Sequence, residues 1–394
     1  MSNAEFKGLT IGVPKEIMNG EKRVAATPET VEKMVQSGAT VLVERGAGVN
    51  ALMADADYEK VGAKLVDKVE ELFNQSDIIL KVKEPIFNSE VGKHEVDMLK
   101  KGQVFITFLH PAAPKNHEMI KSLANSGVTS LTLDGIPRIS RAQTMDALTS
   151  MSAVAGYKSV LLASNRLTKF VPMTGTAVGM IQPAKVVVIG TGVAGLQAVS
   201  TAKRLGAAVT AVDIRPDAIE HSKSLGAKVL DPGVPADVAI GKGGYANSLP
   251  SEWLLKEREN IKDLVIDADI VIATALVPGK LAPVLITEEM VKSMRPGSVI
   301  MDVSIDQGGN CELSESGVIA EYYGVTVNGT NNIPGMMATS STWMFAKNVY
   351  NLIAAFIKEG KFLIDREDEI IASTLVTMDG ELLHAGAREA MGLK

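Results

Sequence analysis

Cysteine and long apolar runs are both scarce in this chain. Its 394 residues include one cysteine, Cys311, so no internal disulfide can form, and such usage is typical of a protein of the reducing cytosol. No stretch of about 18 apolar residues runs free of charges or glycine breaks, so we expect no direct membrane span. The first eight residues are polar, and we expect no hydrophobic signal peptide.

Histidine and excess positive charge are also missing. The five histidines show no metal-ligand spacing, so we expect no metal site: they are His94, His110, His117, His221 and His384. The net charge is −6, with Lys and Arg scattered among acids, which argues against a nucleic-acid partner. A composition of 46% hydrophobic and 22% charged residues is that of a globular protein, and the length favours two domains.

One stretch, from Pro183 to Arg215, carries the clearest pattern. The β-branched run Lys185 to Ile189 predicts a buried parallel strand, and it leads into Gly190, Gly192 and Gly195 at the spacing G-x-G-x-x-G. The first glycine suits the tight turn, the second lets backbone N–H groups approach a pyrophosphate, and the third lets helix and strand pack closely. A helix follows, and its positive end would hold the pyrophosphate. We therefore predict a dinucleotide site here.

The acid that such a site needs follows at the expected place. A second strand, Ala208 to Val212, ends at Asp213, which is placed to accept hydrogen bonds from a ribose 2′-hydroxyl. Its charge would repel a 2′-phosphate and favours NAD(H), although nearby Arg215 leaves NADP(H) as an alternative. The residues expected beside the nucleotide also include Thr191, Val193 and Ile214.

Strands alternate with helices along most of the chain, which predicts an α/β fold of two doubly wound, Rossmann-like domains with parallel sheets. The expected strands before the glycines are Leu9–Val13, Thr40–Glu44, Ile78–Val82, Val104–Leu109 and Ser130–Leu133, and those after Asp213 are Ala227–Leu230, Ile270–Thr274, Ser298–Asp302 and Val325–Val327. Two long helices, within Ile139 to Leu167 and Trp343 to Lys358, would join the domains, with the nucleotide in the cleft. Asp379-Gly380 predicts a hairpin.

Over nearly its whole length the chain resembles the NAD(H)-binding alpha subunit of proton-translocating NAD(P) transhydrogenase, and almost as widely alanine dehydrogenase. The stretches shared with both are Gly12–Glu16, Arg23–Ala25, Glu44–Gly48, Lys81–Pro85, the glycine fingerprint and Pro296–Asp302. The resemblance implies that the C-terminal part completes the first domain. We expect a first domain of 1–140 with 330–394 and an NAD(H)-binding domain of 141–329.

Three segments resemble the transhydrogenases more than the alanine dehydrogenases. They are Pro137–Asp146, similar to a loop against the nicotinamide, Gly243–Ala246, similar to a mobile nucleotide-covering loop, and Gly308–Cys311, followed by the C-terminal hairpin. The chain also ends where the soluble part of that family ends, which resembles the split form with membrane segments on another chain.

The transhydrogenase resemblance implies roles for the first of these segments. Hydride transfer abstracts no proton from either nicotinamide carbon, so the protein has to position the rings and exclude water. By resemblance, Arg138, Gln143 and Asp146 orient the carboxamide and ribose, with Ser140 and Thr149 beside them; the family often has serine at the last position. The alternative is a basic loop that caps the following helix.

Two further positions are expected at the nucleotide. Tyr245, with Gly244 on the same Gly/Pro-rich loop, would close over the adenosine side, and the alternative is an ordinary surface loop. Leu276 follows the C-terminus of a strand, where ligands lie in such sheets, and the alternative is plain packing.

The resemblance also implies partners. NAD(H) would bind this chain, and NADP(H) would bind a partner beta subunit; a membrane-spanning subunit would complete the assembly. The chain would be a homodimer, cytoplasmic, and peripheral to the cytoplasmic membrane through those partners. Activity would then require the other subunits.

Alanine dehydrogenase remains the rival interpretation. In that family the keto-acid and the moving protons are handled by residues that match Arg23, Lys83, His110 and Asp306, and all four types are present. A non-catalytic NAD-binding regulatory module is a third alternative.

Overall fold

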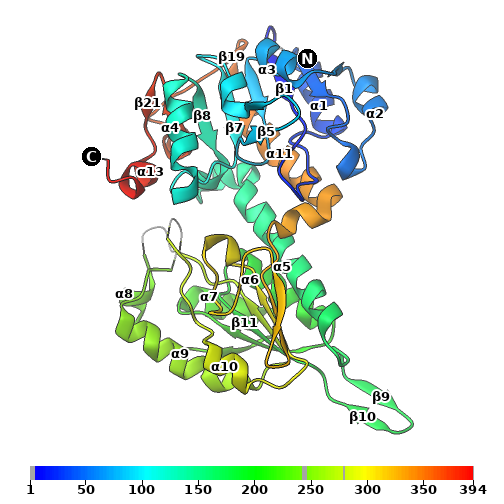
Figure 1. Cartoon of the computed structure of the whole chain (residues 1–394), viewed down its shortest axis with the longest axis vertical. Helices are drawn as coiled ribbons and strands as arrows, with labels where there is room; N and C mark the ends of the chain where they lie inside the picture. Colours follow the sequence, from blue (N-terminus) through cyan, green and yellow to red (C-terminus); the bar gives the residue numbers. More distant parts are fainter. Residues whose placement is uncertain (1–4, 242–245, 278–279, 394) are drawn as a thin grey trace. The chain divides into compact units, whose positions relative to one another are not determined.

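The computed structural model describes residues 5–241, 246–277 and 280–393. The chain divides into two compact units (Figure 1): unit 1 is Met1–Met151 with Gly335–Lys394, and unit 2 is Ser152–Pro334. The functional domain boundaries expected above stay a prediction. Within the described residues, no helix combines the length and apolar character needed to cross a membrane.

Unit 1 is built on an eight-stranded sheet with the order β21-β20-β8-β7-β4-β1-β2-β3. Six of its strands pair in parallel, while β20 runs antiparallel to β8 and to β21. The strands are β1 Thr10–Val13, β2 Thr40–Glu44, β3 Lys64–Val66, β4 Ile78–Leu80, β7 Val104–Thr107, β8 Thr129–Thr132, β20 Leu375–Met378 and β21 Glu381–Leu382. Short pairs lie apart from this sheet: β5 Phe87–Asn88 with β6 Lys93–His94, and β18 Ile357–Lys358 with β19 Lys361–Phe362.

The helices of unit 1 begin where the sequence supplies caps. Thr27 accepts from the N–H of Thr30 at 3.2 Å, and Pro28 occupies the first helical position, as the sequence predicts. The α-helices are α1 Pro28–Gln36, α2 Asp55–Lys60, α3 Val69–Gln75, α4 His117–Asn125, α11 Ala338–Phe356, α12 Glu369–Thr374 and α13 Ala385–Ala390; α5 Ala147–Arg166 continues from unit 1 into unit 2. The 3-10 turns are η1 Val49–Ala51, η2 Glu95–Met98, η3 Pro114–Asn116, η4 Leu133–Gly135, η5 Ser140–Met145 and η8 Ile333–Met337.

The C-terminal segment is a structural part of unit 1. Val376 of β20 packs in the same buried cluster as Leu72, Phe105 and Ile120. The hydroxyl of Thr377 lies 2.7 Å from that of Ser130 in β8 and donates to the carbonyl of Val128 at 2.9 Å. The β20–β21 hairpin turns at Asp379 and Gly380, both with positive φ, which confirms the expected hairpin.

Unit 2 contains a seven-stranded sheet with the order β13-β12-β11-β14-β15-β17-β16, parallel except for β16. The strands are β11 Lys185–Ile189, β12 Ala208–Val212, β13 Lys228–Leu230, β14 Ile270–Ala273, β15 Val299–Asp302, β16 Ile319–Tyr322 and β17 Val325–Asn328. The helices are α6 Val193–Arg204, α7 Pro216–Ser224, α8 Ala236–Ala239, α9 Ser251–Ile266 and α10 Glu288–Ser293, with η7 Ile305–Gln307. The two sheets confirm the expected doubly wound α/β class.

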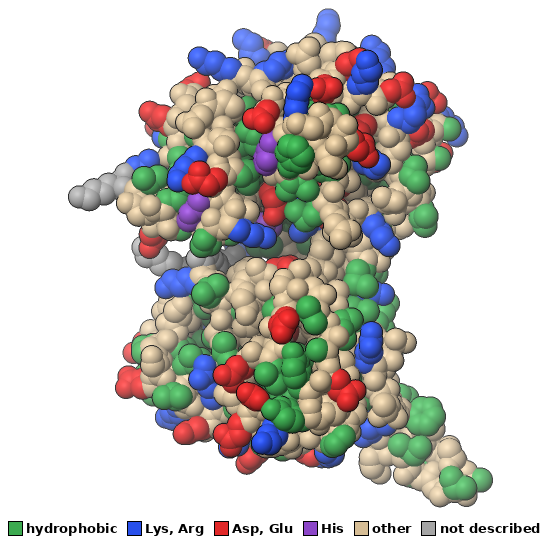
Figure 2. All heavy atoms as spheres, viewed as in Figure 1, with side chains coloured by type: hydrophobic (Ala, Val, Ile, Leu, Met, Phe, Trp, Pro, Cys, Tyr) green, Lys and Arg blue, Asp and Glu red, His purple; other side chains and the backbone are tan. Residues whose placement is uncertain are grey.

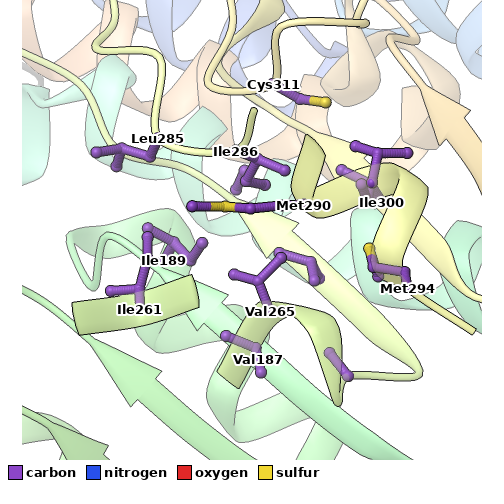
Figure 3. Packing of buried hydrophobic residues seen from close by; sticks show 14 of the residues in the cluster. Val187, Ile189, Ile261, Val265, Leu285, Ile286, Met290, Met294, Ile300 and Cys311 are labelled. Atoms are coloured by element: carbon purple, nitrogen blue, oxygen red, sulfur yellow. The ribbon is translucent and has the colours of Figure 1, made fainter. Parts of the chain in front are cut away.

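Two buried clusters cover the two faces of this sheet. Alternate residues of β11 enter different clusters: Val187 and Ile189 pack with α9 and α10, whereas Val186 and Val188 pack with α5 and α6. Figure 3 shows Ile189, Ile261, Val265 and Met290 pointing into the first of these clusters. Because both faces are covered, the strands read as continuous apolar runs.

Three features differ from the sequence prediction. The helical stretch expected from Ile139 is divided into η5 and α5, because the carboxylate of Asp146 accepts from the N–H of Thr149 at 2.8 Å and starts a new helix there. The helix α9 and the antiparallel hairpin of β9 Thr174–Thr176 and β10 Gly179–Ile181 were not expected.

We predict that Thr377→Val destabilises unit 1 by about 1–2 kcal/mol, because the buried Ser130 hydroxyl loses its partner while the side-chain volume is kept. Urea unfolding followed by circular dichroism measures this change. Thr40→Val in β2 is the control, since the described residues give the Thr40 hydroxyl no side-chain hydrogen bond. Equal losses for the two variants would contradict the prediction.

Candidate functional site

The three fingerprint glycines of unit 2 each meet a different steric demand. Gly190 follows β11 with φ +82°, and a Cβ there would lie 2.7 Å from the Cα of Ala275. A Cβ on Gly195 would lie 1.9 Å from the carbonyl oxygen of Gly190, so only glycine lets α6 approach the loop so closely. These two positions confirm a tight turn and a close helix–strand contact.

Gly192 differs because the space beside it is open. A Cβ there would meet one described atom within 4 Å, Nη2 of Arg215 at 3.9 Å. Gly192 is also the N-cap of α6, and no side chain caps the helix. The first amides of α6 are therefore available to an anion, and the helix dipole favours negative charge at this end. The residues present fit a dinucleotide pyrophosphate.

Asp213 lies at the end of β12 and is buried, with 6% exposed. Its Oδ2 accepts from the N–H of Thr191 at 2.7 Å and from Nη2 of Arg215 at 2.8 Å. Its Oδ1 accepts from the N–H and Nε of Arg215, both at 2.9 Å. Asp213 thus fixes the glycine loop through Thr191, and Arg215 covers the carboxylate that a ribose hydroxyl would use.

A second acid near Asp213 was missed by the sequence analysis. Glu257, on α9, is 6% exposed, and burial together with the charge of Asp213 raises its pKa to about 7. Its spacing from the buried residues Ile261 and Val265, four and eight positions later, would have placed it on the inner face of a helix. The signal was present, but α9 itself was not predicted.

The remaining nucleotide positions are partly described. Val193 and Ile214 are half-buried beside the loop, and Leu276 is 38% exposed after β14. Gly244 and Tyr245 lie outside the described residues. The described part of the chain contains no group of three or more His, Cys, Asp or Glu that could hold a metal ion.

In unit 1, the segment from Arg138 to Thr149 turns its side chains in different directions. Arg138, Ser140 and Gln143 are exposed. Asp146 instead accepts from the N–H and the hydroxyl of Thr149, at 2.8 and 2.7 Å, and so begins α5. The helix-capping alternative therefore describes Asp146 and Thr149 in this structure, while the three exposed side chains are presented at the surface.

Residues far along the sequence hold this segment in place. The side-chain amides of Asn348 and Asn351 on α11 both donate to the carbonyl of Thr144, at 2.9 and 3.1 Å. Arg141 forms an ion pair with Asp368, the N-cap of α12, at 2.8 Å. The sequence analysis missed these three partners, because no local pattern marks a contact across more than 200 residues.

The residues of the rival interpretation are divided between the units. Arg23, Lys83 and His110 belong to unit 1, and Asp306 is an exposed residue of η7 in unit 2. Arg23 is buried and donates through Nε and Nη2 to the carboxylate of Glu21, at 2.8 and 2.6 Å.

His110 forms a hydrogen-bonded ion pair. Its Nδ1 lies 2.7 Å from Oδ1 of Asp134, and its backbone N–H donates to Oδ2 at 2.8 Å. Burial lowers the pKa of His110, but the charge and hydrogen bond of Asp134 outweigh it, so the pKa is raised. Burial alone would raise the pKa of Asp134, and His110 lowers it to about 2. This pair is able to hold and release a proton near neutral pH.

Unit 1 also contains a buried charge cluster. Lys81, 1% exposed, contacts Glu95 at 2.5 Å and Glu16 at 3.6 Å. Glu16 also accepts from the N–H of Val82 at 2.6 Å, and burial raises its pKa to about 7. The cluster ties the end of β4 to the segment after β1.

Comparison with known proteins decides the family. Residues 12–155 match the alanine dehydrogenase/PNT N-terminal domain, and residues 159–385 match its C-terminal domain. The chain belongs to the alanine dehydrogenase/PNT family.

Within the alanine dehydrogenase/PNT family, the two branches lie at different distances. The chain is 42% identical to the first polypeptide of the divided NAD(P) transhydrogenase alpha subunit of Rhodospirillum rubrum, over 95% of this chain and 98% of that protein. It is 32% identical to the alanine dehydrogenase of Methanococcus maripaludis, over 98% and 97%. The alanine dehydrogenases are therefore the more distant relatives.

The fold alone does not separate the branches. A crystal structure of transhydrogenase from Sinorhizobium meliloti matches with a TM-score of 0.81 and 35% identity, covering 95% of this chain and 99% of that one. An L-alanine dehydrogenase structure matches with the same TM-score and 29% identity, covering 98% and 99%. Both family structures confirm the Rossmann-like architecture, and membership of this family supports nicotinamide dinucleotide binding.

We predict that Asp134→Asn lowers the pKa of His110, because burial then acts without the opposing carboxylate. NMR titration of the His110 ring measures the change, with Asp57→Asn on the surface of α2 as the control. A His110 pKa that stays at its wild-type value would contradict the prediction.

The same pair predicts a pH dependence of stability. His110, whose pKa is raised, stabilises the folded state most at low pH and loses this as pH rises through its folded pKa; Asp134 loses its contribution as pH falls toward about 2. The stability difference between wild type and Asp134→Asn should therefore be largest from about pH 4 to 6.5. Urea unfolding across the pH range measures it, and a difference that is constant from about pH 3 to 9 would rule this out.

Proposed function

We propose that this chain is the NAD(H)-binding subunit of a proton-translocating NAD(P) transhydrogenase. The observation that carries the proposal is the 42% identity to a transhydrogenase alpha subunit along nearly the whole of both chains, against 32% for the alanine dehydrogenase. The glycine loop supports it independently, because Gly192 leaves room for a pyrophosphate at the uncapped end of α6. The cofactor is then NAD(H), with NADP(H) on the partner beta subunit.

Bound NADH supplies a hydride, two electrons and one proton, to the nicotinamide of NADP⁺. The residues of this chain bind and orient. The amides of α6 hold the pyrophosphate, and Asp213 accepts from the adenosine ribose once the Arg215 guanidinium makes way. Gln143 can both donate to and accept from the carboxamide, while Arg138 and Asp146 position the nicotinamide ribose. No side chain has to remove a proton from carbon, so the protein contributes alignment and exclusion of water.

The rigidity of the Arg138–Asp146 segment suits such a role. Ala142 and Met145 are buried beneath it, and Asn348 and Asn351 fix the carbonyl of Thr144 from α11. The exposed Gln143 is therefore carried on a backbone that is held on both sides. A reactant held in a fixed orientation gains rate because less motion has to be lost at the transition state.

The partners follow from the same proposal. The chain would work with a membrane-spanning subunit and an NADP(H)-binding subunit, on the cytoplasmic side of the membrane. Within such an assembly it would be an oxidoreductase that is active only with its partners.

The His110–Asp134 pair favours one second candidate, NAD-dependent deamination of L-alanine. Imine formation and hydrolysis need a group that moves protons near neutral pH, and His110 beside Asp134 has that chemistry. Arg23 and Lys83 belong to the same unit, and their positive charges suit a carboxylate substrate.

The two candidates are separated by assays on the purified chain. The transhydrogenase proposal expects NADH binding, seen by fluorescence titration, and no steady turnover of L-alanine with NAD⁺. Adding the NADP(H)-binding and membrane subunits should then produce hydride transfer, which Gln143→Asn should slow. Rapid deamination of L-alanine by the chain alone would overturn the proposal in favour of alanine dehydrogenase.

Two glycine variants make the binding test specific. Gly192→Ala should fold like wild type, since its Cβ has space, but should raise the Kd for NADH by about tenfold or more because the methyl group stands where the pyrophosphate approaches. Gly195→Ala should lower the thermal midpoint, because its Cβ overlaps the carbonyl oxygen of Gly190. Unchanged NADH affinity in Gly192→Ala would remove the glycine loop from the site.

The homodimer expected from the resemblance has a candidate surface in unit 2. The β9–β10 hairpin carries Val178, Met180 and Met173 with 99, 61 and 53% exposed, and Phe170 nearby is 54% exposed. Figure 2 shows apolar side chains on the extension where Figure 1 places this hairpin. Contiguous exposed apolar surface marks an interaction site. We propose that a second copy of the chain covers it, as closed symmetric pairs are the commonest oligomers.

We therefore predict that Val178→Asp converts a dimer into a monomer, because burying the new carboxylate in an apolar contact is costly. Sedimentation velocity gives the mass of each variant. Leu255→Asp, at an exposed position of α9, should leave the dimer intact. A dimer that survives Val178→Asp with Met180→Asp would exclude the hairpin as the interface.

A further inference from the structure

The segment Gly308–Cys311 has no role in the proposed hydride transfer, yet its asparagine is fully buried. Asn310 is 0% exposed, and its side-chain amide makes three hydrogen bonds to backbone groups. Oδ1 accepts from the N–H of Ala275 at 2.9 Å, and Nδ2 donates to the carbonyls of Ala275 and Pro283 at 2.9 and 2.8 Å. The amide thus pairs with both backbone groups of Ala275, as a neighbouring strand would.

The backbone of Asn310 is fixed just as firmly. Its N–H and that of Cys311 both donate to Oδ2 of Asp302, at 2.8 and 2.9 Å. Its carbonyl accepts from the N–H groups of Leu285 and Ile286, at 2.8 and 2.9 Å. Asp302 ends β15 and is 0% exposed, so the asparagine is anchored to the sheet and not to a surface loop.

Ala275, which the amide holds, lies against the glycine loop. The Cα and N of Ala275 are the atoms that a Cβ on Gly190 would meet first. The neighbouring Thr274 donates its hydroxyl to the carbonyl of Gly190 at 2.6 Å. Leu276 comes next in the chain and is partly exposed at the carboxyl edge of the sheet. The position of this turn relative to the glycine loop therefore depends on what holds Ala275.

We propose that Asn310 is a positioning residue for the dinucleotide, an inference that rests on the proposed NAD(H)-binding function. Asn310 sets the turn Thr274–Leu276 at its distance from Gly190 and so shapes the β14 side of the site. In this sheet the order changes direction between β11 and β14, where ligands bind, and Asp213 lies on the opposite, β12 side. Asn310 thus acts on the nicotinamide half of the nucleotide, and Asp213 on the adenosine half.

The chemistry of the site restricts this position to an amide. Aspartate has the same size, but its carboxylate would face the carbonyl oxygens of Ala275 and Pro283 with no hydrogen to donate. When protonated, the same carboxyl regains one donor. Serine is shorter and can bridge only part of the distance.

The test uses the full chain and two ligands, NADH and 5′-AMP, with fluorescence titration and calorimetry. Asn310→Asp at about pH 8 should raise the Kd for NADH by about tenfold or more, since two backbone carbonyls lose their donor. The Kd for 5′-AMP should change by less than about twofold, because the β12 side is untouched. The NADH affinity of Asn310→Asp should recover toward wild type as the pH is lowered and the carboxyl is protonated.

Ser298→Ala is the matched control. It removes a buried side-chain bond to the carbonyl of Ala268, 3.1 Å long, at the opposite edge of the same sheet, and should leave both affinities unchanged. Should Asn310→Asp fail to fold, Asn310→Ser replaces it, and hydrogen exchange of the peptide that contains Ala275 should be faster than in wild type.

The outcomes are distinct. Equal loss of NADH and 5′-AMP binding, or NADH binding equal to wild type in a folded variant, would overturn the positioning role and leave the proposed function intact. Failure of the wild-type chain to bind NADH would overturn the proposed function itself, and the positioning role with it.

Discussion

The candidate site depends on how closely the first turn of α6 approaches the carbonyl group of Gly190. A side chain at Gly195 would fill that space, since its Cβ would lie 1.9 Å from the Gly190 oxygen. The hydroxyl of Thr274 donates to the same oxygen, so a carbonyl turned inward is not left without a partner. With these groups in contact, the uncapped amides of α6 and the end of β12 meet at one point of the sheet. The chemistry of the loop follows from this contact, because an anion there meets the first amides of a helix that no side chain caps.

Asp213 shows how one carboxylate can serve both structure and recognition. It fixes the backbone of Thr191 and at the same time binds the guanidinium of Arg215. Glu257 adds a second acid close by, whose raised pKa reflects burial beside a like charge. The adenosine side of the loop is therefore a region of opposed charges, in which Arg215 offsets two carboxyl groups.

The sequence was sufficient for features whose cause is local. The glycine spacing, the cap at Thr27 and the turn at Asp379 and Gly380 each depend on a few adjacent residues, and the structure confirms them. The family likewise follows from short motifs, and the comparisons confirm it. By contrast, the contacts of Asn348 with Thr144 and of Asn310 with Ala275 join residues 204 and 35 positions apart. Such pairs depend on the finished packing, so single residues such as these give no signal in a sequence read alone.

The closing strand of unit 1 has a consequence for biosynthesis. Unit 2 is one uninterrupted segment, whereas the sheet of unit 1 receives β20 opposite β8, through a pairing that spans 247 residues between Ser130 and Thr377. A ribosome delivers the N-terminal end first, and domains generally fold as units as they emerge. Unit 2 is thus able to fold during translation while the older half of unit 1 waits with an unpaired edge strand. An open strand edge is a template for aggregation, so chaperone occupancy on the nascent chain should be concentrated there until the last strand arrives.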